Sequence, residues 1–262
     1  MKIDLAGKRA LVCGSTAGIG KAVALQLAEA GATVTLLARN EEKLKSVLSE
    51  LDSSADQKHG YLIADFSKPE ALKIVVENYM KSAKRYHILL NNTGGPAGGK
   101  AVDAELNEFE AAFRSHLICN HILVQALVEG MKAEKYGRII NIISTSVKIP
   151  LNGLGVSNTI RGAVASWSKT LANELGEFGI TVNNVLPGAT ETERLSSIIS
   201  NKAFKTGKTE EEVSNAMRAQ VPAGRFAQAR EVAAAATFLA SPLAGYINGI
   251  NVPVDGGRTG SL

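Results

Sequence analysis

The sequence predicts an α/β protein in which a doubly wound, Rossmann-type parallel sheet of about seven strands carries helices on both faces. Short β-rich runs alternate with longer amphipathic stretches, as in a parallel sheet covered by helices. Several of the short runs are apolar almost throughout, which is typical of strands buried on both faces. The length of 262 residues suits one domain, and no Pro-, Gly- or Ser-rich linker divides the chain. Residues 1–262 are therefore expected to form a single domain.

The individual elements follow from apolar periodicity, with short apolar runs between turn residues assigned as strands and amphipathic stretches as helices. The expected strands are Arg9–Cys13, Thr33–Leu37, Gly60–Ala64, Ile88–Asn91, Gly137–Ile143, Ile180–Leu186 and Asn251–Val254. The expected helices are Ile19–Glu29, Glu41–Leu51, Pro69–Lys81, Leu106–Lys132, Ser157–Leu175 and Ala229–Leu239.

One stretch, residues 189–223, breaks this alternation. It is charged and rich in Lys, Glu and Ser, with a helical pattern and no strand signal. It falls between the sixth and seventh strands, next to the carboxyl edge at which doubly wound sheets bind ligands. We expect a helical lid over that edge. A solvated helical excursion without such a role is the alternative.

Composition excludes several kinds of partner. The net charge of +4 comes from interspersed charges without a basic run, so no nucleic-acid binding is expected. The N-terminal residues lack the apolar core of a signal peptide, and no segment has the length and apolarity of a membrane span, which predicts a cytoplasmic protein. Cys13 and Cys119 lie in apolar stretches without metal-ligand spacing, which predicts two buried reduced thiols and no metal site.

A glycine-rich turn follows the first expected strand and opens a helix: Cys13-Gly14-Ser15-Thr16-Ala17-Gly18-Ile19-Gly20. Glycines are needed where the backbone turns sharply and where a pyrophosphate approaches main-chain N–H groups at a helix N-terminus. A tight turn without a ligand would also use glycines. However, Asn91-Asn92-Thr93-Gly94 and Pro187-Gly188 follow two further strands, so three such loops meet at one edge of the sheet. Their convergence favours a dinucleotide-binding site.

With these motifs the chain resembles the short-chain dehydrogenase/reductase family, and within it the 3-oxoacyl-(acyl carrier protein) reductases. The resemblance covers essentially the whole chain, including Asp65, the segment Val221–Phe226 and the ending Asn248–Gly257. It implies that the glycines cradle the pyrophosphate, that Asp65 bonds the adenine and that Asn91 lines the cleft while bracing neighbouring strands. The cofactor-binding candidates are Gly14, Ser15, Thr16, Gly18, Ile19, Gly20, Arg39, Asp65, Asn91, Gly94, Arg161, Pro187, Gly188 and Thr192.

The choice of cofactor can be argued from charge. An acidic residue after the second strand would accept hydrogen bonds from both ribose hydroxyls and repel a 2′-phosphate. The chain has Leu37-Ala38-Arg39-Asn40 there, with a cation and no carboxylate. Because a guanidinium binds phosphate through two parallel hydrogen bonds, NADP(H) is favoured over NAD(H). The alternative is that Arg39 is simply a solvated residue at the strand end.

The catalytic positions of the family are mostly replaced. The resemblance places Ser144 in the serine position after the fifth strand, but it places Ser157 and Arg161 at the positions of the Tyr-x-x-x-Lys motif. His116 stands at the position of the family's asparagine. A serine hydroxyl is a far weaker acid than a phenol, and an arginine is too basic to relay a proton. His116 is a candidate replacement acid, although a structural histidine is the commoner role.

Two functions remain open. The first is an atypical NADP(H)-dependent oxidoreductase that reduces a ketone or 3-oxoacyl-type carbonyl, with a proton from Ser144, His116 or water. The second is a catalytically silent or regulatory dinucleotide-binding protein that keeps the fold without the Tyr/Lys relay. The first is favoured because the nicotinamide side of the chain is preserved. The expected partners are a small-molecule carbonyl or acyl-carrier substrate and further copies of the chain, as a homotetramer or dimer.

Overall fold

The computed structural model describes residues 2–82 and 85–261, and in this part of the chain seven strands form one sheet. Their order is β3-β2-β1-β4-β5-β6-β9, and all neighbouring strands run parallel. The order reverses between β1 and β4, the switch point at which doubly wound sheets bind ligands. The predicted fold is thereby confirmed. The strands are β1 (Arg9–Cys13), β2 (Thr33–Ala38), β3 (Gly60–Ile63), β4 (Ile88–Asn91), β5 (Gly137–Ile142), β6 (Ile180–Pro187) and β9 (Asn251–Val254).

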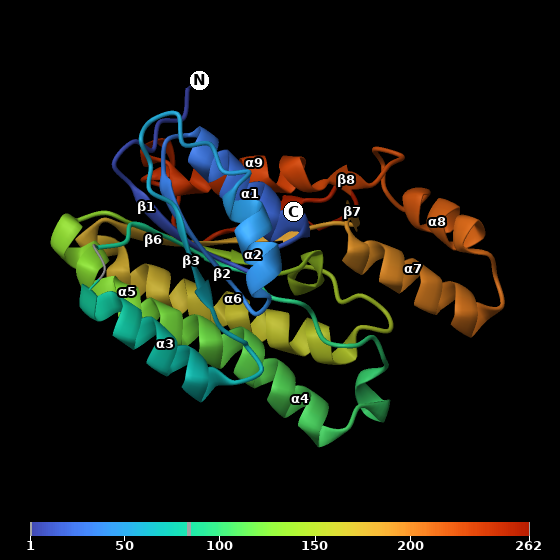
Figure 1. Ribbon diagram of the computed structural model, residues 1–262. Coiled ribbons are helices and arrows are strands. Elements are labelled where there is room, and N and C mark those ends of the chain that lie inside the picture. Colours follow the sequence, from blue (N-terminus) through green and yellow to red (C-terminus); the bar gives the residue numbers. More distant parts are fainter. Residues whose placement is uncertain (1, 83–84, 262) are drawn as a thin grey trace.

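Helices cover both faces of this sheet (Figure 1). Helices α1, α2 and α9 lie on one side, with α1 packed against α9, and α3, α4, α5 and α6 lie on the other, with α3 packed against α5. The helices are α1 (Gly18–Glu29), α2 (Glu41–Leu48), α3 (Pro69–Ser82), α4 (Leu106–Phe113), α5 (Cys119–Glu134), α6 (Gly155–Leu175), α7 (Glu193–Thr206), α8 (Glu210–Arg218) and α9 (Ala229–Ala240).

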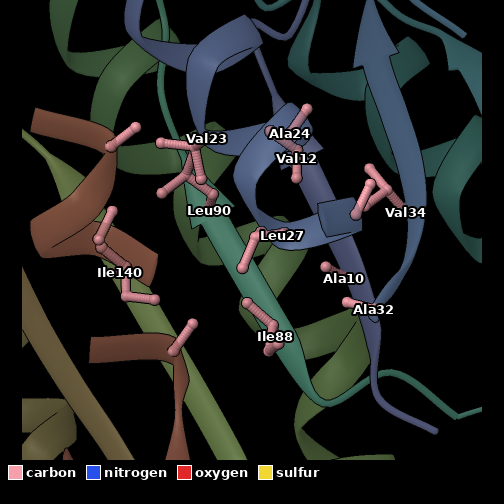
Figure 2. Close-up of a cluster of buried hydrophobic side chains, with 14 of the residues drawn as sticks. Ala10, Val12, Val23, Ala24, Leu27, Ala32, Val34, Ile88, Leu90 and Ile140 are labelled. Atoms are coloured by element: carbon pink, nitrogen blue, oxygen red, sulfur yellow. The ribbon is translucent and has the colours of Figure 1, made fainter. Parts of the chain in front are cut away.

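Strand alternation divides the core into two layers, because successive side chains of a strand point to opposite faces. In β1, Ala10 and Val12 join the cluster under α1 and α9, whereas Leu11 and Cys13 join the cluster under α3 and α5. Figure 2 shows the first layer, in which Leu27 of α1 lies over the sheet. With both faces covered, the central strands β1, β4, β5 and β6 consist largely of buried apolar residues.

The long helix expected over Leu106–Lys132 is interrupted. α4 ends at Phe113, a π-helical segment spans Arg114–Ile118, and α5 begins at Cys119. A π segment inserts one residue into a helical turn, a shift too small to disturb apolar periodicity, so the sequence pattern did not reveal it. The predicted helix Glu41–Leu51 also ends early, at Leu48, because the Glu50 and Leu51 amides bond three residues back in tighter turns.

The expected insertion at residues 189–223 contains α7 and α8, which extend beyond the sheet in Figure 1. They share a small apolar cluster of their own with Phe226. Contrary to the prediction of no strand, Thr190–Glu191 (β7) pairs in parallel with Ala227–Gln228 (β8). Two residues are too few to show an alternating pattern.

Both cysteines are free and buried, as predicted. Burial raises the pKa of the Cys13 and Cys119 thiols well above the usual range, so both are protonated at neutral pH. Across residues 2–82 and 85–261, none of the helices has the length and apolarity needed to span a membrane.

Candidate active site at the carboxyl edge of the sheet

The loop between β1 and α1 depends on glycine at three positions. Gly14 and Gly18 have φ angles of +58° and +53°, in the left-handed region that favours glycine. A β-carbon added to Gly20 would lie 2.2 Å from the carbonyl oxygen of Gly14, closer than van der Waals contact permits. The loop therefore folds tightly against the first turn of α1, and no side chain larger than hydrogen fits between them.

This loop is anchored by Asn92, which the sequence reasoning did not single out. The Asn92 amide donates 3.3 Å hydrogen bonds to the carbonyl oxygens of Cys13 and Gly14. On the other side, the Gly14 amide donates to the carbonyl oxygen of Leu37 at 2.9 Å. The glycine loop is thus tied both to the end of β2 and to the loop after β4. The sequence offered one signal for this role: two asparagines stand in a row at the end of β4, and only Asn91 had been given a function.

The N-terminus of α1 is suited to bind an anion. Its N-cap residue, Ala17, provides no side-chain hydrogen bond, and the first turn holds no acidic residue. Helix N-termini present unpaired N–H groups and a partial positive charge, which together favour phosphate. Ser15 is fully buried beside this turn, with its hydroxyl 3.5 Å from the carbonyl oxygen of Leu37. These features fit the pyrophosphate of a dinucleotide.

The loop after β6 reaches the glycine loop. A β-carbon added to Gly18 would lie 3.1 Å from Cγ2 of Thr192, so the two loops are in near contact. Thr192 also caps α7, accepting a hydrogen bond from the Leu195 amide at 3.4 Å. Gly188, next to Pro187, packs so closely on Asp255 that a β-carbon there would lie 2.7 Å from its Cα. The start of α7 is therefore fixed beside the candidate cofactor site.

The candidate residues for the adenosine end lie after β2 and β3. Arg39 is exposed, and its charge contributes to lowering the pKa of Asp65, behind the larger contribution of a hydrogen bond from the Ser67 amide. The Asp65 carboxylate accepts that bond at 2.9 Å. Thr16 and Ile19 are half-buried in the glycine loop and first turn. This arrangement puts one cation and one carboxylate near each other at the ends of two adjacent strands.

Asn91 begins a row of four asparagines that runs from the central strand β4 to the edge strand β9. Its amide donates to Asn141 on β5 at 2.8 Å, Asn141 donates to Asn184 on β6 at 3.0 Å, and Asn184 donates to Asn251 on β9 at 2.9 Å. The four residues are also direct register partners. The Ser168 hydroxyl of α6 donates to the side-chain oxygen Oδ1 of Asn184 at 2.8 Å. Polar residues inside otherwise apolar strands were the signal for this row, which the sequence analysis missed beyond Asn91.

Ser144 stands at the end of β5 and is half-buried. Its hydroxyl oxygen accepts a 3.1 Å hydrogen bond from the Ser146 amide and caps the following short helix. That bond orients the oxygen and leaves the hydroxyl proton available to a carbonyl acceptor. Ser157, in the first turn of α6, is half-buried as well.

Arg161 lies one turn further along α6 and is almost fully buried, with 8% of its surface exposed. Its Nη1 donates to the carbonyl oxygen of Ile142 at 2.8 Å, at the end of β5 and two residues before Ser144. Burial and the nearby charge of Arg194 lower the pKa of Arg161 to about 10. It therefore remains a cation at neutral pH and contributes positive potential at the end of the central strands.

Arg194, in the first turn of α7, reaches toward the same edge of the sheet. Its Nη2 donates to the carbonyl oxygen of Pro96 at 2.7 Å, so α7 is tied to the loop after β4. Arg194 was not singled out from the sequence, because a contact across so many residues leaves no local pattern.

His116 lies in the π-helical segment and is buried, with 2% of its surface exposed. Burial and the charge of Arg161 lower the pKa of His116 to about 3, and a hydrogen bond with the Gly94 backbone opposes that shift only weakly. The imidazole is therefore neutral in the physiological range. Both His116 and Gly94 line a hollow of about 560 Å³ between the loop after β4 and α4.

A glycine-rich turn and a buried positive charge at the switch point of a doubly wound sheet are typical of nucleotide-binding α/β proteins. Comparisons with known proteins identify the family. A profile of the family described as enoyl-(acyl carrier protein) reductase matches residues 14–259. A 3-oxoacyl-(acyl-carrier-protein) reductase of Aquifex aeolicus is 31% identical over 257 residues, spanning 98% of this chain and 99% of that one.

Solved structures agree. An L-sorbose reductase of Gluconobacter frateurii, complexed with NADPH and L-sorbose, superimposes with a TM-score of 0.92 at 29% identity and full coverage of both chains. YwfH, an NADPH-dependent reductase involved in bacilysin biosynthesis, gives 0.91 at 27% identity, covering 97% of this chain and 99% of that one. The chain belongs to the short-chain dehydrogenase/reductase family and is classed with the NAD(P)-dependent oxidoreductases.

Proposed function

We propose that this protein is an atypical NADP(H)-dependent oxidoreductase that reduces a ketone or a 3-oxoacyl-type carbonyl. One observation carries the proposal: loops after β1, β4, β5 and β6 meet at the switch point. There a glycine cradle and an uncapped helix N-terminus lie beside a buried cation and an oriented hydroxyl. The relatives support the carbonyl class, since they are named as a 3-oxoacyl reductase and a sorbose reductase.

NADP(H) is the proposed cofactor. The glycine loop and α1 would hold its pyrophosphate, and Thr192 would lie beside the nicotinamide end. Arg39, exposed after β2 and without an ion-pair partner in the described part of the chain, would bind the 2′-phosphate. Solved relatives that contain NADPH support the choice of the phosphorylated form.

The bound reduced cofactor would supply a hydride to the substrate carbonyl, whose oxygen then gains negative charge and needs a hydrogen-bond donor and a proton. Ser144 would donate the hydrogen bond, because its oxygen is fixed by the Ser146 amide and its proton is available. Arg161 would stabilise the growing charge through its buried positive field, which is strong where water is excluded.

The proton source is the atypical part of the proposal. By the family resemblance, Ser157 and Arg161 replace the tyrosine and lysine of the usual relay. His116 is neutral, and with a pKa of about 3 its protonated form is too scarce to act as the acid at neutral pH. We infer that Ser144 and water deliver the proton and that the rate is lower than with a phenol, since one proton donor contributes roughly 10²–10⁴-fold.

Two further proposals concern the surroundings of the site. The insertion at residues 189–223 would act as a lid, because α7 is tied to the loop after β4 through Arg194 and α8 packs on α7 rather than on the sheet. Assembly into a dimer or tetramer stays a prediction. Exposed Leu106 and Phe113 on α4 would suit such a contact.

The test is a fluorescence titration of the protein with NADPH and NADH, followed by turnover assays with ketones and a 3-oxoacyl thioester. We expect NADPH binding with enhanced nicotinamide emission, and slow NADPH-dependent reduction that falls in the Ser144→Ala variant. NADPH binding without turnover of any carbonyl would instead support the catalytically silent alternative. Failure to bind either nucleotide would refute both.

A further inference from the structure

Two guanidinium groups from distant elements meet at Gly95. A β-carbon built on Gly95 would lie 3.5 Å from Nη2 of Arg194 and 3.6 Å from Nη2 of Arg161. The two nitrogens therefore flank a single small space, which Gly95 leaves open because it has no side chain. Arg161 enters from α6 and Arg194 from α7, while Gly95 belongs to the loop after β4.

Arg161 is buried and Arg194 is exposed, and no carboxylate within ion-pair distance neutralises either one among residues 2–82 and 85–261. Neither arginine takes part in an ion pair there, and the charge that most affects Arg161 is that of Arg194 itself. Their hydrogen bonds go to neutral carbonyl oxygens, those of Ile142 and Pro96. Placing a buried cation next to a second cation is unfavourable unless an anion joins them.

We propose that Arg161 and Arg194 together bind an anionic group of the substrate, a carboxylate or a phosphate, in the space beside Gly95. This inference rests on the proposed function, because it assigns the substrate of the same site to the class of anionic carbonyl compounds. A guanidinium offers five N–H donors, and each arginine has used only part of them on a backbone carbonyl. Carboxylate and phosphate oxygens match the remaining donors in geometry and charge.

The position favours a substrate over the cofactor. Arg194 is two residues beyond Thr192, on the lid side of the site, and Arg161 bonds the end of β5 close to Ser144. The pyrophosphate already has a cradle at the N-terminus of α1. An anion beside Gly95 would lie between the lid and the oriented hydroxyl, so it would orient a carbonyl in the same molecule and hold α7 against the loop after β4.

The first experiment measures binding directly, by calorimetric titration of the protein loaded with oxidised NADP, which has no hydride to transfer, with two matched pairs of probes. The carboxylate pair is acetoacetate and its neutral methyl ester, and the phosphate pair is dihydroxyacetone phosphate and dihydroxyacetone. We expect an anionic probe to bind at least about tenfold more tightly than its neutral partner, the equivalent of one charge-assisted hydrogen bond. A preference within one pair alone identifies the carboxylate or the phosphate as the ligand. Equal affinities within both pairs would overturn the proposal.

Variants assign the effect to the arginines. Arg194→Gln should remove about tenfold of the anion's affinity and leave NADPH affinity unchanged, whereas Lys202→Gln, the same charge change on the exposed part of α7, should alter neither. If Arg194→Gln weakened NADPH and not the anion, the pair would bind the cofactor and the inference would be wrong.

A second variant uses the open space itself. Gly95 has no positive φ angle and tolerates a β-carbon at ordinary contact distance, so Gly95→Asp should fold and place a carboxylate between the guanidiniums. We expect it to abolish anion binding, keep NADPH binding and raise Tm. Unchanged anion affinity would overturn the proposal. Reduction of neutral ketones by the wild type without any anion preference would leave the proposed function standing and refute this inference alone.

Discussion

At the carboxyl edge of the sheet, the nucleotide half is formed by backbone atoms and the reaction half by side chains. The nucleotide half, around Gly14–Gly20, consists of backbone packed so closely that an added carbon at Gly20 would overlap the Gly14 carbonyl. The proposed reaction half consists of side chains, namely Ser144, Ser157 and Arg161, which project from a strand end and a helix. Where the backbone itself forms the site, an added side-chain atom disturbs its packing. Where side chains form the site, single substitutions can change its chemistry while the fold persists. Under the proposed function, this difference would let the side chains of the reaction half change while the nucleotide cradle is kept.

The largest effect should come from disturbing the backbone half. Gly20→Ala places a carbon 2.2 Å from the Gly14 carbonyl oxygen, so the loop must open, and we expect NADPH affinity to fall at least about 100-fold. A fluorescence titration measures it. Gly60→Ala is the matched control, because its added carbon meets nothing within 4 Å. Equal losses in both variants would mean that loop packing is not what holds the nucleotide.

A smaller effect is expected in the side-chain half. Ser144→Ala removes one oriented donor to a developing negative charge, and we expect kcat/KM to fall about 10- to 100-fold with NADPH affinity unchanged. Steady-state kinetics with the best ketone measures this split. Ser166→Ala, at an exposed position of α6, should have no effect. If Ser144→Ala instead weakened nucleotide binding, the division into two halves would break down.

A change at Arg39 tests the border of the nucleotide half, where a side chain adds to what the backbone provides. Arg39→Gln should raise the Kd for NADPH about tenfold while leaving that for NADH unchanged, because only NADPH carries the 2′-phosphate. Parallel titrations with both nucleotides check this, with Lys43→Gln on the exposed face of α2 as control. A parallel loss for both nucleotides would show that Arg39 does not select the phosphate.

The smallest effect concerns His116 and pH. The folded protein holds the pKa of His116 at about 3, below the 6.5 of an unperturbed histidine, so the unfolded chain binds a proton that the folded chain excludes. Stability is therefore complete above pH 6.5 and falls as pH drops toward 3, by about 1 kcal/mol at pH 6. Denaturant unfolding at pH 7.5 and 6.0 measures the loss. His116→Asn should lose less, and an identical pH dependence would argue against a buried neutral imidazole.

The sequence predicted those features of the fold and site that are set by strand burial or by short local motifs. Central strands such as Ile88–Asn91 were located to the residue because a strand covered on both faces must be apolar. The loops at the carboxyl edge were found because glycine and asparagine mark them. Arg194 beside Gly95 was beyond reach, because it depends on the direction in which α7 leaves the sheet. The π-helical segment holding His116 was missed because one inserted residue leaves the apolar pattern almost intact.

The row of asparagines through Asn91, Asn141, Asn184 and Asn251 has a consequence for how the molecule opens. The neighbouring strands β4, β5, β6 and β9 are joined in succession by a side-chain hydrogen bond as well as by the backbone ladder. Separating any one of these strands would leave a buried amide without a partner in its neighbour, so partial opening is penalised at every step. The four strands should exchange their amide protons as a single cooperative unit, later than β3 at the far edge.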